Sequence, residues 1–402
     1  MHRAAKLAIV SGFALALLTS TGVGATEQPP QTNAESLLGA DVQGENWTVA
    51  PVVPSDGYVW IFAVKTPYGE FHVNGLRRMK DRLQELRALG LLEKMSRTKA
   101  FADAMIAAGL APLRFGRDLI VDPFETVGNF VSGVARMFDS VVATVGNSGR
   151  SRDPFFDNVT GITKAERELA QELGVDPYSD FTPLRSGLED VAQATTAGSL
   201  PITAAISMIP GGAGIAVSSV STASQVSAVV YSHTSREMFE IVANTLIGLG
   251  VDKATAKKFV GNTFYSPADE FAIAEALENL SATNSTAFIE SANTAGSFDV
   301  AKFNRYRAEL LARESVRLGT LKSFELVSGF ALNRDASGRL VAVFPFDTLA
   351  WTDSVSRSLT ALSVKFNSQH EALHAALAST GSLSPLAKVE LKKLGWEFVE
   401  LN

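Results

Sequence analysis

Apolar residues at two different spacings organise the early part of the chain. Residues 58–64 form a β-branched and aromatic run, 66–69 contain the turn residues Pro and Gly, and 70–74 alternate polar with apolar residues. This order predicts a β-hairpin whose first strand is apolar on both faces. From Leu76 onward apolar residues recur every three or four positions, which predicts an amphipathic helix with its arginines on the other faces.

Helical patterns then dominate until the last part of the chain. Thr163 and Glu166 have the spacing of a capping box, Asp252 is a typical N-cap, and Pro267 follows Ser266 at a predicted helix start. The further elements that the pattern predicts are a long amphipathic helix at 297–318, strands at 324–332 and 339–346, helices at 355–378 and 385–394, and a strand at 396–401.

These elements predict a mainly α fold with minor β, that is, an α+β fold. It would consist of a helical body, an N-terminal β-hairpin and a small C-terminal α+β unit. The predicted organisation is a signal peptide at 1–25, a flexible lead-in at 26–57, a β-hairpin plus amphipathic helices at 58–150, a helical domain at 158–320 and the C-terminal α+β unit at 321–402.

The first 25 residues have the layout of a secretory signal peptide. Arg3 and Lys6 precede an apolar run at 7–18, and small residues at 23–25 form a cleavage site. The chain is therefore expected to be exported, to a bacterial periplasm or cell envelope. The following segment, 26–57, is rich in Pro, Gln, Asn, Gly and Ser, which is typical of a flexible stretch.

Composition and charge exclude several classes of function. The chain has no cysteine, so thiol nucleophiles and cysteine metal sites are excluded. A net charge of -6 makes it a poor general binder of nucleic acid. The stretch 65–99 nevertheless holds nine Lys or Arg against four Asp or Glu. Its helical part, 77–99, is either a solvated face or a surface that meets anionic lipid or an acidic partner.

The segment 191–235 contains no Asp, Glu, Lys or Arg. Two apolar arms rich in small residues flank Pro210-Gly211-Gly212, which cannot continue a regular helix. The pattern predicts a helical hairpin that is either buried among other helices or active at a membrane. Its Val and Ile content argues against a flexible linker.

One short motif carries metal chemistry. His370, Glu371 and His374 form an HExxH pattern, which on a helix places both imidazoles on one face for zinc and leaves Glu371 as the general base. The pattern resembles zinc-dependent peptidases over these five residues only, and Ala372 stands where those enzymes favour a larger apolar residue. The third ligand would have to come from one of three glutamates, Glu390, Glu397 or Glu400.

Two functions from different classes follow. The first is a non-enzymatic envelope protein that associates with a partner protein or the membrane surface through the basic helix and the uncharged hairpin. The alternative is a zinc-dependent metallohydrolase that uses His370, Glu371 and His374. Beyond that alternative, no catalytic residue, cofactor or small-molecule ligand can be specified from the pattern.

Overall fold

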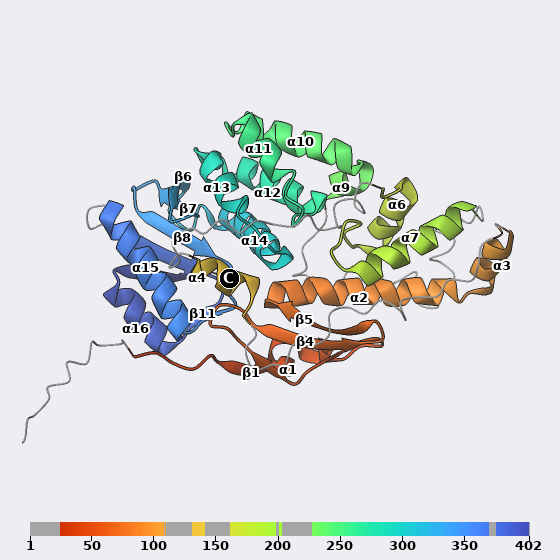
Figure 1. Cartoon of the computed structure of the whole chain (residues 1–402), viewed down its shortest axis with the longest axis horizontal. Helices are drawn as coiled ribbons and strands as arrows, with labels where there is room; N and C mark the ends of the chain where they lie inside the picture. Colours follow the sequence, from red (N-terminus) through yellow and green to blue (C-terminus); the bar gives the residue numbers. More distant parts are fainter. Residues whose placement is uncertain are drawn as a thin grey trace, which may run out of the picture.

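The computed structural model describes residues 25–107, 109, 131–140, 161–197, 201–202, 227–369 and 375–401 (Figure 1). Within these residues the fold is α+β with a helical majority, as predicted. In the same part of the chain, no helix is both long enough and apolar enough to cross a membrane.

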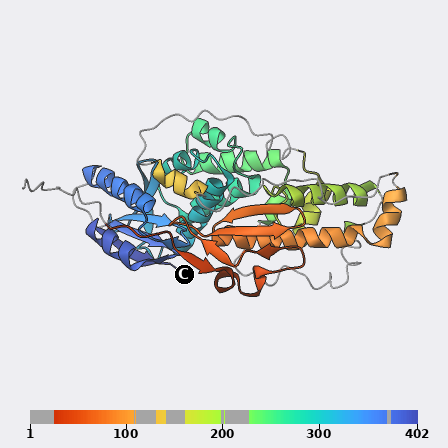
Figure 2. The same cartoon turned by 60° about the horizontal axis from the view of Figure 1, so that its bottom comes forward.

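The predicted hairpin is confirmed and packs on a long helix. Strand β4 (Ile61–Thr66) pairs antiparallel with β5 (Gly69–Asn74), and β2 (Thr48–Val49) pairs with the other side of β4. One face of the hairpin packs against α2 (Leu76–Ser96), and Figure 2 shows the two strands lying over that helix. The buried residues of this inner face are Phe62, Val64, Phe71 and Val73.

The segment expected to be a flexible lead-in is instead ordered, which corrects that prediction. It forms β1 (Gln31–Asn33), α1 (Ala34–Leu38), a 3-10 turn η1 (Gly39–Val42) and β3 (Val52–Pro54), which pairs with β1. The Asn33 side chain caps α1 by accepting the Glu35 N–H at 2.8 Å. The apolar residues that anchor the segment are widely spaced among Pro, Gln and Gly, so composition concealed them. They are Ala34, Leu38, Trp47, Val49 and Val53.

Two groups of helices cover the rest of α2 and the top of the molecule in Figure 1. The first group is α3 (Lys99–Ala107), α6 (Lys164–Leu173) and α7 (Thr182–Ala197). The second is α9 (Ala228–Ser232), α10 (Ser235–Gly248), α11 (Lys253–Phe259), α12 (Pro267–Leu280) and α13 (Ser285–Ala292). The predicted caps at Thr163, Asp252 and Ser266 are all confirmed by side-chain hydrogen bonds to the first turn.

Helix α14 (Phe298–Glu314) connects these helices to the C-terminal unit and is buried along most of its length. That unit contains a five-stranded sheet in the order β12-β10-β8-β7-β6, in which β8, β10 and β12 are parallel. Its elements are β6 (Leu321–Val327), β7 (Phe330–Asp335), β8 (Leu340–Phe344), β9 (Thr348–Leu349), α15 (Asp353–Gln369), β10 (Ala375–Ser379), β11 (Ser382–Leu383), α16 (Pro385–Lys393) and β12 (Trp396–Glu400). Helix α4 (Gly133–Asp139) packs beside α14 and α15.

Two predictions for the C-terminal unit are wrong. The strand expected at 324–332 is broken by a turn at Ser328 and Gly329, both with positive φ, so β6 and β7 form a hairpin of their own. The helix expected at 355–378 ends at Gln369, and its last part is the buried strand β10. A short run of Ala and Leu fits a buried helix or a buried strand equally well, and pairing with β8 and β12 decides between them.

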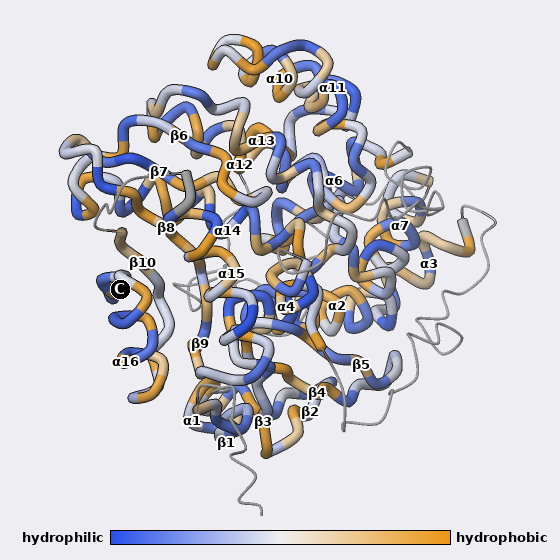
Figure 3. The backbone as a smooth tube through the Cα atoms, turned by 60° about the vertical axis from the view of Figure 1, so that its left-hand side comes forward, coloured by the Kyte–Doolittle hydropathy of each residue, from blue (hydrophilic) through white to orange (hydrophobic). Residues whose placement is uncertain are grey.

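The hydrophobic core crosses the predicted domain boundaries. One cluster of buried residues joins the hairpin and α2 to α6 and α7, and another joins α10 through α14 to the sheet. A third connects Tyr58, Val59 and α4 to the other face of that sheet. In Figure 3 strand β8 at this junction is coloured as apolar. The boundaries themselves stay predictions.

Candidate functional site

Two arginines of the predicted basic helix do not face solvent, which corrects the expectation that they lie on its outer faces. Arg78 and Arg82 on α2 are only 5% and 7% exposed. Arg78 is paired with Asp180, and Arg82 lies 2.7 Å from Glu85 and 3.4 Å from Asp180. A guanidinium in this position is engaged inside the protein and cannot reach a lipid headgroup.

The other cations of the stretch 65–99 are also paired. Eight of its nine Lys and Arg residues form an ion pair with a carboxylate, and several partners come from distant segments. The pairs besides those of Arg78 and Arg82 are Lys65–Glu70, Arg77–Glu309, Arg87–Asp41, Lys94–Glu45, Arg97–Glu93 and Lys99–Asp103. The positive excess seen along the chain is therefore balanced in space.

These pairs continue into a buried ionic network between α2, α12, α14 and residues 176–180. Asp269 on α12 accepts hydrogen bonds from Lys302 at 2.7 Å and Arg305 at 3.0 Å. The members of the network are Arg77, Arg78, Asp81, Arg82, Glu85, Asp176, Asp180, Asp269, Lys302, Arg305, Tyr306 and Glu309.

Burial and pairing shift the pKa values of the network's carboxyl groups in opposite directions. Burial opposes ionisation of Asp180 and Asp269, but the cations beside them outweigh it and lower both pKa values. Burial raises the pKa of Glu85 and Asp176, because the nearby cations offset only part of the effect of burial. Networks of this kind occur at active sites and also in structural cores. Here the charges are satisfied by one another, so we assign the network a structural role.

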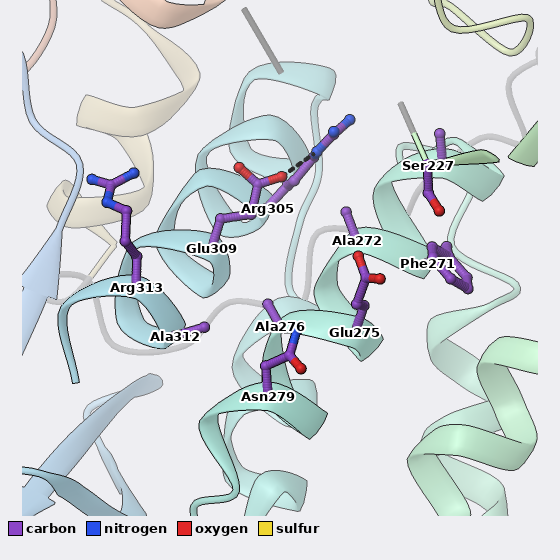
Figure 4. A pocket seen from close by; sticks show the side chains of 11 residues that line it. Ser227, Phe271, Ala272, Glu275, Ala276, Asn279, Arg305, Glu309, Ala312 and Arg313 are labelled. Atoms are coloured by element: carbon purple, nitrogen blue, oxygen red, sulfur yellow. Dashed lines mark hydrogen bonds and ion pairs between the residues drawn. The ribbon is translucent and has the colours of Figure 1, made fainter. Parts of the chain in front are cut away.

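A pocket of about 370 Å³ opens at the edge of this network, between α12 and α14. Four alanines are among its lining residues, and Figure 4 shows Arg305 and Glu309 of α14 hydrogen-bonded to each other beside it. Arg313 at its margin pairs with Glu314. The pocket's arginines are thus already neutralised, and the space is small compared with the groove described next.

A groove of about 960 Å³ lies on the opposite face of the β4–β5 hairpin, and we call it the outer groove. Its floor is the outward face of the hairpin, formed by Ile61, Ala63 and His72. One wall is the N-terminal segment with β3, and the other is α4 with the start of α15. The residues of these walls are Thr26, Glu27, Gln28, Pro29, Gln31, Ala50, Pro51, Val52, Pro54, Ser55, Asp56, Val131, Ala135, Asp139, Thr352, Asp353, Ser354 and Arg357.

The outer groove combines apolar surface with a few charged groups, which is typical of sites for organic ligands. Val52 and Val131 are 56% and 40% exposed, and both line it. Its volume is near the upper end of the range for small-molecule sites. Burial lowers the pKa of His72, which favours the neutral imidazole.

Hydrogen bonds inside the walls hold the groove's carboxylates in position. Asp56 accepts the Tyr58 and Val59 N–H groups, each at 3.0 Å, and the Ser132 N–H at 3.2 Å. One oxygen of Asp139 accepts the hydroxyls of Ser354, at 2.6 Å, and Ser358, at 3.1 Å.

The two remaining carboxylates are held in the same way. One oxygen of Glu27 accepts the Trp351 N–H and the Ser384 hydroxyl. One oxygen of Asp353 accepts the Thr26 hydroxyl at 2.5 Å. Side chains fixed by such bonds lose little further freedom when a ligand binds.

The predicted zinc motif lies outside the described residues. Helix α15 ends at Gln369 and β10 begins at Ala375, so His370, Glu371 and His374 fall between two described elements. Two of the possible third ligands are already paired, Glu390 with Lys393 at 2.6 Å and Glu397 with Arg339 at 3.0 Å. In the part of the chain that the structure covers, no group of three or more His, Cys, Asp or Glu could hold a metal. The zinc site stays a prediction.

The zinc hypothesis has a direct test. It requires about one zinc per chain in the purified mature protein and loss of that zinc in His370→Ala and His374→Ala. The isolated His233→Ala serves as the control. We expect elemental analysis to find no stoichiometric metal, and the two substitutions to change stability by no more than about 0.5 kcal/mol. Stoichiometric zinc that disappears with either substitution, and not with His233→Ala, would establish the metallohydrolase alternative.

The uncharged segment 191–235 is described at its two ends and at residues 201–202. Residues 191–197 belong to α7 and 228–232 form α9, with Val191 and Val230 fully buried. The middle of the predicted hairpin, residues 198–200 and 203–226, lies outside the described residues. Whether this hairpin is buried or membrane-active therefore stays a prediction.

Comparison of the chain with protein-family models, curated proteins and solved structures finds no match. The candidate site therefore depends on geometry alone. Sequence reasoning missed the outer groove, because its lining comes from several separate segments, none of which has a motif. The one available indication was the turn-rich segment at 26–57, whose composition pointed to flexibility instead.

Proposed function

We propose that the chain is a non-enzymatic binding protein of the cell envelope and that the outer groove is its ligand site. The observation that carries the proposal is the groove itself: about 960 Å³, with exposed apolar side chains and carboxylates fixed by hydrogen bonds. The proposed location follows from the signal-peptide pattern at 1–25.

The groove's polar groups favour binding over catalysis. Its hydroxyls at Thr26 and Ser354 donate directly to carboxylates. A carboxylate is a weak base at neutral pH, and activation of a hydroxyl nucleophile ordinarily needs a histidine or lysine beside it. His72 is the groove's imidazole, and it lies on the floor strand β5 rather than in either hydroxyl–carboxylate pair.

Association with a membrane surface or an envelope partner remains a second proposal, with weaker support. In this proposal the basic helix at 77–99 and the uncharged hairpin are the contact regions. The cations of that helix are largely paired with carboxylates, and exposed pairs of this kind leave little net field beyond a Debye length.

Filling the groove should abolish ligand binding. We expect Val52→Trp and Val131→Trp each to remove a small molecule that wild-type protein retains from an envelope extract, as read by native mass spectrometry. Val389→Trp on α16 is the matched control, since Val389 is 51% exposed and does not line the groove. All three should change stability by no more than about 0.5 kcal/mol. The proposal is wrong if the groove variants keep the ligand, or if wild-type protein retains none.

A further inference from the structure

Negatively charged groups outnumber positively charged groups in the lining of the outer groove. Four carboxylates, Glu27, Asp56, Asp139 and Asp353, face one guanidinium, that of Arg357. Burial lowers the pKa of His72, which disfavours a second positive charge in the lining. Carboxylates on both walls of a concave site focus negative potential into it. The groove therefore attracts cations and repels anions.

Three of these carboxylates have an oxygen that accepts no hydrogen bond from the described residues. In the described structure no hydrogen bond reaches Glu27 Oε2, Asp139 Oδ2 or Asp353 Oδ2, while the other oxygen of each is bonded to its own wall. The three acceptors come from the N-terminal segment, α4 and α15. Their hydrogen bonds hold all three beside residues 351–354, but among the described residues they do not form a group that could hold a metal ion.

Apolar surface lines the same groove as these acceptors. Ile61 and Ala63 form the floor, and Val52 and Val131 are exposed on opposite walls. The prolines at 29, 51 and 54 add apolar rings without N–H groups. A ligand that matches this lining carries several hydrogen-bond donors with positive charge, joined by methylene segments.

We infer that the outer groove binds a linear aliphatic amine with two or more amino groups. This inference rests on the proposed binding function and specifies its ligand class. Each ammonium group would donate to one of the three carboxylate oxygens, and the methylene segments would lie on the apolar floor. Charge-assisted bonds of this kind are stronger than neutral ones, and the carboxylates are already held in place.

Titration calorimetry with putrescine, cadaverine, spermidine and spermine tests the inference on the mature protein. Hexane-1,6-diol and glutarate are the neutral and anionic controls. We expect at least one amine to bind and both controls to fail. Asp139→Asn and Asp353→Asn keep side-chain volume and one oxygen, and each should weaken amine binding about tenfold, as for the loss of one charge-assisted hydrogen bond. Asp103→Asn, on the surface of α3, should leave the affinity unchanged.

The outcomes separate this inference from the proposed function. The amine class is wrong if no amine binds, if glutarate binds better, or if the amines bind equally well to the two groove variants. If the tryptophan variants still lose a ligand from the envelope extract, the binding function stands without the amine class. If the amine test fails and the tryptophan variants also keep their ligand, both proposals are wrong.

Discussion

Replacing Asp269 with asparagine is expected to lower the free energy of unfolding by about 3–5 kcal/mol. Asp269 is 1% exposed, and one of its oxygens accepts hydrogen bonds from both Lys302 and Arg305. Its other oxygen accepts the Ser266 N–H at 3.2 Å, which completes the capping box of α12. Asparagine has one oxygen, so it cannot serve both positions, and it leaves two buried cations without their shared negative charge.

Urea unfolding measures this change. Asp103→Asn is the matched control, because it breaks the exposed pair with Lys99 and should cost less than about 0.5 kcal/mol. Asp269 ionises readily despite its burial, since Lys302 and Arg305 lower its pKa. A loss for Asp269→Asn no larger than that of the control would show that the buried ionic network does not stabilise the fold.

The wild-type protein is expected to lose stability through Asp347 as the pH rises from about 4 to about 7, and Asp347→Asn should remove that loss. Burial raises the pKa of Asp347 to about 7, with Asp56 adding to the effect and two backbone N–H groups opposing it. The folded state therefore holds this proton more tightly than the unfolded state. Between about pH 4 and pH 7 the Asp347 carboxyl is ionised in the unfolded state and still protonated in the folded state. This difference lowers the free energy of unfolding by on the order of 4 kcal/mol at most.

Asparagine is a suitable replacement because a single oxygen of Asp347 makes both of its side-chain bonds. Oδ2 accepts the Trp60 and Leu76 N–H groups, each at 2.9 Å, and the amide oxygen of asparagine can take its place. These bonds join the start of β4 and of α2 to the loop after β8. We expect the variant to match wild type at pH 4 and to be more stable at pH 8.

The comparison of Asp347→Asn with wild type isolates Asp347 from other buried carboxyls, such as Glu85, whose pKa burial also raises. Urea unfolding at pH 4 and pH 8 provides the four values needed. Asp252→Asn is a contrasting control, since hydrogen bonds to the start of α11 lower the pKa of Asp252 and its replacement should bring no gain at pH 8. Equal pH dependence in wild type and Asp347→Asn would refute the prediction.

Features encoded within a few residues were predicted well. The capping box at Thr163, the cap at Asp252, the helix start at Ser266 and Pro267, and the β4–β5 hairpin all appear where the pattern indicated. Each depends on hydrogen bonds or side-chain periodicity between residues close in the chain. Local interactions of this range are readable because their geometry does not depend on the rest of the fold.

Features that depend on distant partners were missed or misread. The run at 375–379 was assigned to a helix, yet parallel pairing with β8 and β12 makes it a strand. The Ser328-Gly329 turn was present in the sequence as a turn dipeptide, but the apolar residues around it favoured one long strand. The polar composition of residues 26–57 predicts a flexible segment. Its few apolar residues are nevertheless buried in the core shared with the β4–β5 hairpin and α2.

The sequence by itself determined the helical majority, the β4–β5 hairpin and several helix starts, because these arise from periodicity and capping. Only the tertiary structure decided where the charges of α2 go and where a ligand could bind. Arg78 meets Asp180 across 102 positions, Arg77 meets Glu309 across 232, and Asp347 reaches Trp60 across 287. The outer groove likewise exists only where the N-terminal segment, the hairpin, α4 and α15 come together. No local pattern can encode such encounters, because they are selected by the packing of the whole core.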